Sequence, residues 1–114
     1  MWKDVVRNMP TAIWTVRVST ADQPEVVHEV PLAETAETDG LIIATTPPCH
    51  VRVADVSTPP TRLRITAASN HALVEILEGA VSCYDHPLSQ RVNRFDWMPL
   101  SFGQTTVTLN FRNG

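Results

Sequence analysis

The residues most able to do chemistry in this sequence are two cysteine–histidine pairs. Cys49 directly precedes His50, and Cys83 lies three residues before His86, with Asp85 between them. Thiolate, imidazole and carboxylate groups are ligands that zinc prefers, and four of them can form a tetrahedral site. Adjacent residues of a strand point to opposite faces, so Cys49 and His50 could bind one metal only from a turn. The alternative is partly buried thiols and loop histidines. We predict no metal site and no cofactor, and keep a small zinc-dependent enzyme as the last of three functional hypotheses.

Sequence patterns typical of other catalytic sites are missing. The chain has no Gly-x-Ser-x-Gly motif and no His-x-His pair, and its four glycines are too dispersed for a phosphate-binding loop. Glu75 and Glu78 fall on opposite faces of an expected strand, which does not suit paired acid–base catalysis. We therefore predict no catalytic residues and a protein that is not an enzyme.

The densest group of residue types enriched at binding surfaces lies between positions 84 and 102. It supplies four of our five candidate binding residues, which are Tyr84, Arg91, Arg94 and Trp97. The fifth is Trp2, which must pack onto its own domain or onto another molecule. Three interpretations stay open. The aromatic residues could close one end of the core, anchor a protein interface, or present flat rings on which a sugar stacks.

A repeated pattern in the middle of the chain indicates the elements that position these residues. Residues 46–53 and 58–65 each begin with Thr-Pro-Pro and end in an apolar–Arg–apolar triplet. Proline lacks an N–H group and so ends a strand, whereas the alternation after it places the apolar side chains on one face and arginine on the other. The pattern predicts strands over residues 51–56 and 62–68.

Period-two alternation predicts further strands over residues 12–19, 25–32 and 105–112. We also expect strands over 41–46, which is a continuous apolar run, over 71–78 and, after the turn at Gly79, over 80–84. A short helix over 72–77 is an alternative. Residues 2–9 are expected to form two helical turns, 33–40 an acidic loop, 69–70 a tight turn and 85–101 a long irregular segment. Together these elements predict one all-β domain over residues 1–114. We expect an antiparallel two-sheet sandwich, jelly-roll or immunoglobulin-like, with about seven to eight strands and at most one or two short helices.

Composition limits the partners of this domain. The chain has 114 residues and a net charge of −3, which argues against nucleic acid and anionic membranes as partners. No apolar run approaches the length of a membrane span, and the N-terminus does not resemble a signal peptide. We expect synthesis in a cytoplasm, where Cys49 and Cys83 default to free thiols; whether they pair stays open.

Charge is unevenly distributed along the chain. Residues 19–50 contain six acidic residues and no lysine or arginine, whereas the whole chain has a single lysine against eight arginines. Complementary patches of this kind could join copies of a homo-oligomer, and arginine is favoured at interfaces.

These features give three functional hypotheses. The first is a non-enzymatic structural or interaction protein that assembles with itself or with other subunits. We expect an accessory or decoration component of a virus or phage particle, located in the virion. The second is a carbohydrate-binding module that uses exposed Trp and Tyr, and the third is the zinc enzyme. Partner identity, copy number and sheet topology stay open.

Overall fold

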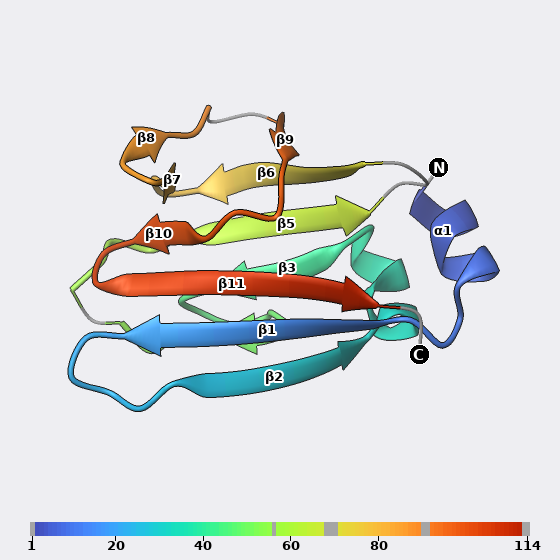
Figure 1. The fold of residues 1–114 in the computed structure, drawn as a ribbon, viewed down its shortest axis with the longest axis horizontal. Coiled ribbons are helices and arrows are strands. Elements are labelled where there is room, and N and C mark those ends of the chain that lie inside the picture. Colours follow the sequence, from blue (N-terminus) through green and yellow to red (C-terminus); the bar gives the residue numbers. More distant parts are fainter. Residues whose placement is uncertain (1, 56, 68–70, 90–91, 113–114) are drawn as a thin grey trace.

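Two β-sheets pack face to face in the computed structural model, which describes residues 2–55, 57–67, 71–89 and 92–112 (Figure 1). Two short helices lie at one end of the sheets: α1 over Trp2–Asn8 and the 3-10 helix η1 over Leu32–Thr38. The predicted all-β two-sheet sandwich is therefore confirmed. Neither helix of the described residues is long and apolar enough to cross a bilayer.

The first sheet has six strands in the order β2-β1-β11-β10-β7-β8. Their bounds are β1 Ile13–Thr20, β2 Val26–Pro31, β7 Ser82–Cys83, β8 His86–Pro87, β10 Leu100–Phe102 and β11 Thr105–Arg112. β1 and β11 pair antiparallel along their whole length, from Ile13 opposite Arg112 to Thr20 opposite Thr105. The clean alternation that predicts the C-terminal strand thus forms the centre of this sheet.

The second sheet has five strands in the order β4-β3-β5-β6-β9. Their bounds are β3 Leu41–Ala44, β4 Val51–Arg52, β5 Arg62–Ala67, β6 Ala72–Glu78 and β9 Val92–Phe95. β4 runs parallel to β3, while the other pairs in this sheet are antiparallel. Because a parallel neighbour must start from the same end of the sheet, the β3–β4 loop carries the chain back along β3 before β4 begins.

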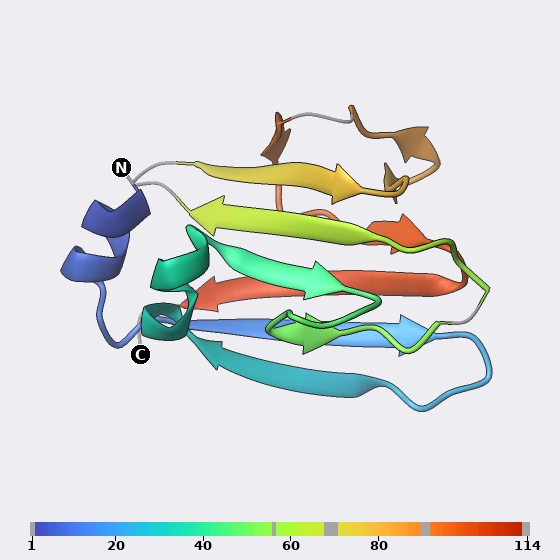
Figure 2. The ribbon, with the colours of Figure 1, turned by 180° about the vertical axis from the view of Figure 1, so that it is seen from behind.

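The ends of the sandwich differ in character. Figures 1 and 2 show α1, η1 and the end of β11 at one end, and the connections β1–β2, β3–β4, β4–β5, β6–β7 and β10–β11 at the other. We call this second end the loop end. Hydrogen bonds join its connections to each other: Thr45 N–H donates to Thr61 O at 3.0 Å, and Thr61 N–H donates to the Thr45 hydroxyl at 3.0 Å.

The inner faces of both sheets form one apolar core. Trp14, Val16 and Val18 of β1 are buried, as their predicted shared face requires, and Leu63 and Ile65 of β5 have no exposed surface. Val51 and Val53, the apolar positions after the first Thr-Pro-Pro, are at most 1% exposed. Both repeats therefore contribute their apolar side chains to the core and their arginines to the outer face.

Several local predictions are wrong. The described residues form eleven strands, more than expected, because the segment 85–101 contains β8, β9 and β10 instead of being irregular. Strands of two to four residues show too little alternation to be read from sequence.

Other differences lie outside that segment. The acidic loop contains η1, which is held by buried Thr35 through its hydroxyl bond to Leu32 O at 2.7 Å. The parallel β3–β4 pair departs from the expected antiparallel order, and the predicted turn at 69–70 lies outside the described residues.

One buried carboxylate fastens the β4–β5 loop to the β10–β11 turn. Oδ1 of Asp55 accepts bonds from the Ser57 N–H at 2.9 Å and hydroxyl at 2.5 Å. Oδ2 accepts bonds from the Gln104 N–H and the Thr105 hydroxyl, both at 2.8 Å. Hydrogen bonds lower the pKa of Asp55 to about 2, and the Ser57 hydroxyl has the largest effect. Burial acts in the opposite direction but is outweighed by the donors. Gly103 lies against this carboxylate with φ +59°, where an added Cβ would come within 2.6 Å of Thr58.

We predict that Asp55→Asn lowers the free energy of unfolding by about 2–4 kcal/mol, because an amide nitrogen would face two donors that need an acceptor. Since folding depresses this pKa, the stabilisation is complete above the ordinary aspartate pKa and is lost as the pH falls toward 2. Urea unfolding between pH 2 and pH 7 measures both effects.

The control variant is Asp22→Asn, since Asp22 is exposed and asparagine tolerates its positive φ of 64°. An Asp55→Asn protein as stable as this control at pH 7, with the wild-type acid dependence, would contradict the assigned role.

Candidate functional site

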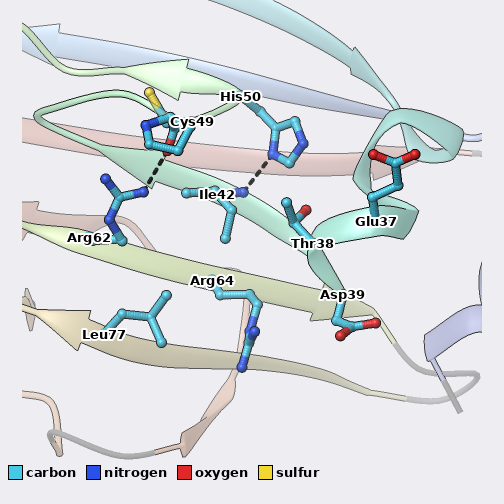
Figure 3. Close-up of a pocket in the computed structure, with 10 residues that line it drawn as sticks. Glu37, Thr38, Asp39, Ile42, Cys49, His50, Arg62, Arg64 and Leu77 are labelled. Atoms are coloured by element: carbon cyan, nitrogen blue, oxygen red, sulfur yellow. Dashed lines mark hydrogen bonds between the residues drawn. The ribbon is translucent and has the colours of Figure 1, made fainter.

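A pocket of about 500 Å³ lies on the outer face of the five-stranded sheet and extends from Arg62, near the loop end, to the end of η1. Ile42 and Leu77 form its apolar part, and the β3–β4 loop and the end of η1 flank it (Figure 3). The ten lining residues are Glu37, Thr38, Asp39, Ile42, Pro48, Cys49, His50, Arg62, Arg64 and Leu77. Basic and acidic groups therefore lie around one apolar surface.

His50 fixes the returning part of the β3–β4 loop against β3. Its backbone N–H donates to Ile42 O at 3.0 Å, and the Ile42 N–H donates to His50 Nδ1 at 2.8 Å. Because Nδ1 accepts this bond, Nε2 carries the proton and donates to Glu34 O, 3.1 Å away. These bonds cover Ile42, which is 7% exposed although it faces outward. His50 thus has a structural role in the pocket wall.

Two arginines lie on either side of the β3–β4 loop where it leaves the sheet. Arg52 of β4 and Arg62 of β5 both lie opposite Ala44, the last residue of β3. The guanidinium of Arg62 donates to Thr46 O at 2.9 Å and to Pro48 O at 2.5 Å, and Nε of Arg52 lies 3.5 Å from Thr45 O. We call Arg52 and Arg62 the arginine pair.

The arginine pair differs electrostatically from four of the seven arginines that the structure describes. Among the described residues Arg17, Arg64, Arg94 and Arg112 form ion pairs with carboxylates, whereas neither Arg52 nor Arg62 has a carboxylate within 4.0 Å in that part of the chain. Carbonyl oxygens orient their guanidinium groups without neutralising them. A guanidinium has five N–H donors, so donors remain for an external anion.

The loops around the arginine pair fit together closely. Gly79 of the β6–β7 connection has φ +85°, and an added Cβ would lie 2.7 Å from the Thr61 hydroxyl oxygen and 2.8 Å from Pro60 O. The Thr61 hydroxyl itself donates to Pro59 O at 2.9 Å. The second Thr-Pro-Pro segment is therefore held between the β6–β7 and β3–β4 connections, which fixes the position of Arg62.

The structure separates the residues of the conceivable zinc site. Cys49 and His50 belong to the β3–β4 loop of the five-stranded sheet, whereas Cys83 and His86 lie opposite each other in the β7–β8 hairpin of the other sheet. Within the described ranges no group of three His, Cys, Asp or Glu side chains could hold a metal ion. Both cysteines are free.

The four predicted binding residues that the structure describes lie on separate elements. Trp2 of α1 packs partly buried against the core, and Tyr84 in the β7–β8 turn is 60% exposed. Arg94 lies 3.5 Å from Asp96 in an exposed ion pair, which contributes little stability. Arg91 lies outside the described residues. No ring contact or ion pair joins the four described candidates to one another, and their part in an interface stays a prediction.

Trp97 has a packing role, which agrees with the first of the three interpretations that the sequence left open for these aromatic residues. Its ring lies 5.0 Å from that of Phe95 on β9 and 5.9 Å from that of buried Trp14 on β1. Trp14 in turn lies 4.8 Å from Phe111 on β11. Trp97 thus joins aromatic residues of both sheets, although 39% of it is exposed.

Sequence reasoning missed the arginine pair and the pocket. The signal was available in the alternation itself, which places the arginines after each Thr-Pro-Pro on the outer face. The sequence does not show that β3 lies between β4 and β5 in the sheet. This strand order places Arg52 and Arg62 beside the same loop.

No protein-family model matches this chain, and no curated protein matches it. Solved structures do resemble it. One, from a structural and functional analysis of phosphothreonine-dependent FHA domain interactions, has a TM-score of 0.54 at 11% identity, covering 84% of this chain and 95% of that one. Another, the FHA domain of FhaA complexed with the intracellular domain of Rv3910, has a TM-score of 0.53 at 12% identity, covering 83% and 99%. At these identities the likeness shows a shared fold.

The comparisons correct our functional prediction. The similar chains are FHA domains, which are described through their interactions with other proteins and not as components of particles. The hypothesis of a virus or phage particle component is therefore wrong, and so is the predicted location in a virion. The carbohydrate-binding alternative is not supported either. Interaction with a protein partner agrees with the comparison, whereas homo-oligomer formation stays a prediction.

We predict that Trp97→Ala lowers the free energy of unfolding by about 2–3 kcal/mol, because it removes the aromatic link between the sheets. Tyr84→Ala, which removes an exposed ring, should change it by less than about 0.5 kcal/mol. Chemical unfolding of both variants distinguishes the roles. Equal, small effects would show that Trp97 is a free contact residue and not part of the packing.

Proposed function

We propose that this protein is a non-enzymatic protein-interaction module that binds a phosphothreonine-containing segment of its partner at the loop end. The proposal has two supports. The fold is similar to that of FHA domains, for one of which phosphothreonine-dependent interactions are described. The arginine pair provides cationic donors at the ends of β4 and β5, beside the β3–β4 loop.

The observation that carries the proposal is the absence of carboxylates, in the part of the chain that the structure describes, around two arginines that share one loop. A phosphorylated threonine has a charge near −2 and three acceptor oxygens. Arg52 and Arg62 together carry the matching charge, and guanidinium forms bidentate bonds to phosphoryl oxygens. The charge and the donor geometry of the pair therefore suit a phosphoryl group.

The hydrogen bonds that already orient Arg62 lower the entropy cost of binding a phosphoryl group. Flexible arginines lose rotamer entropy when they bind, but the bonds from Arg62 to Thr46 O and Pro48 O already restrict that side chain. The side chain that donates hydrogen bonds to the phosphoryl group is thus largely ordered before the partner arrives.

The pocket beside the arginine pair offers space for residues next to the phosphothreonine. Arg62 lines it together with Ile42 and Leu77, and Leu77 is 42% exposed. An extended partner segment whose phosphoryl group lies at Arg62 can place an aliphatic side chain on this surface. The phosphoryl group would thus supply charge-assisted bonds and the pocket would supply apolar contact.

A library of fluorescent peptides with phosphothreonine at a fixed position and varied flanks tests the proposal by fluorescence anisotropy. We expect binding that requires the phosphoryl group and weakens as salt is added. Arg52→Gln and Arg62→Gln should each weaken binding about tenfold or more, since a bond between charged groups contributes about 1.5–3 kcal/mol.

The matched control is Arg17→Gln, because Arg17 is an exposed arginine of the other sheet, already paired with Glu25 at 3.0 Å. Its binding should equal that of the wild type. Peptides that bind equally well with and without the phosphoryl group, or binding unaffected by either Arg52→Gln or Arg62→Gln, would contradict the proposal.

A further inference from the structure

We infer that Thr46 is a phosphorylation site, and that its phosphoryl group binds the arginine pair of the same chain and so blocks the loop end. This inference rests on the proposed function, because it assigns a regulation to the same site. It also gives a role to the Thr46 side chain, which the proposed binding of a partner does not use.

Thr46 is accessible to a modifying enzyme. It is exposed, follows the last residue of β3 by two positions, and precedes Pro47 and Pro48, which are exposed as well. Proline has no N–H group to donate to a strand ladder, and residues 45–48 form a bend outside the strands. A protein kinase that accepts threonine followed by proline can reach such a segment in the folded protein.

The arginine pair already contacts the backbone around Thr46. Arg62 Nη2 lies 2.9 Å from the carbonyl oxygen of Thr46 itself, and Arg52 Nε lies 3.5 Å from that of Thr45. Oγ1 of Thr46, the atom that would carry the phosphoryl group, belongs to the residue whose carbonyl oxygen Arg62 contacts. Arg62 can keep its bonds to Thr46 O and Pro48 O and still has N–H donors left, so the inference requires that the modified Thr46 side chain turn toward this guanidinium.

The modification is an ordinary phosphoryl transfer. A protein kinase transfers the γ-phosphoryl group of ATP to Oγ1 of Thr46, so that the bond from phosphorus to the ADP oxygen breaks, a bond to Oγ1 forms and the hydroxyl proton is released. The product adds a charge near −2 beside two guanidinium groups. It then competes directly with the phosphothreonine of a partner.

The second Thr-Pro-Pro motif provides a matched comparison within the chain. Thr58 also precedes two prolines, but it is half-buried. A Cβ built on Gly103 would lie 2.6 Å from Cβ of Thr58 and 2.8 Å from Oδ2 of Asp55, so Thr58 and the Asp55 carboxylate are close neighbours. A phosphoryl group on Thr58 would therefore meet a negative charge, whereas one on Thr46 would meet two positive charges.

The test compares the full chain carrying phosphothreonine at position 46 with the full chain carrying it at position 58, both made by genetic incorporation. In the first protein we expect the ³¹P titration to give a phosphoryl pKa at least half a unit below its ordinary value of about 6. Arg62→Gln should return it toward that value. Phosphothreonine at position 58 should show no lowered pKa.

Peptide binding supplies the regulatory readout. The protein phosphorylated at Thr46 should bind the phosphothreonine library at least tenfold more weakly than the unmodified chain. An ordinary ³¹P titration at position 46, or unchanged peptide affinity, would overturn the inference. Light scattering that shows a dimer only after phosphorylation of Thr46 would overturn the contact within one chain. If the unmodified chain binds no phosphopeptide, the proposed function fails, while the ³¹P titration still decides whether the arginine pair holds phosphorylated Thr46.

Discussion

Period-two alternation in the strands after the two Thr-Pro-Pro motifs determines both the core and the outer surface of the five-stranded sheet. Val51, Val53, Leu63 and Ile65 are at most 1% exposed, whereas the alternating arginines Arg52, Arg62 and Arg64 lie on the outer face. A register slip of one residue would turn those guanidinium groups into the core and the apolar side chains into water, at a large cost in free energy. The same feature of the sequence therefore closes the core and creates the cationic surface.

The loop end is ordered by polar contacts rather than by apolar burial. Asp55 joins the β4–β5 and β10–β11 connections, and the paired bonds between Thr45 and Thr61 join the β3–β4 and β4–β5 connections. Arg62 adds bonds from β5 to the β3–β4 loop. Loops held in this way lose little further entropy on binding, which is a property that a recognition surface requires. The outer-face pocket extends this surface over Ile42 and Leu77.

Much of the fold could be predicted from the sequence, since long alternating segments such as 105–112 determine both strand and face. The strands in 85–101 could not, because β8 has two residues and β9 has four. The site was predictable only in part. That Arg52 and Arg62 face outward follows from alternation, but their position on either side of Ala44 depends on the parallel β3–β4 pair. Residue type alone directed attention to Trp97, whose ring contacts show that it packs between the sheets.

We propose that Arg52 and Arg62 form an anion site specific for a phosphorylated threonine. This site can be tested by an NMR titration of ¹⁵N-labelled protein with phosphothreonine blocked at both termini. We expect saturable shifts of the Arg52 and Arg62 Nε–H signals and of the amides of residues 44–46 and 49–50, with no such shifts for blocked threonine. Shifts that do not saturate, that are equal for the two compounds, or that gather at Arg7 on the opposite end of the sandwich would contradict it.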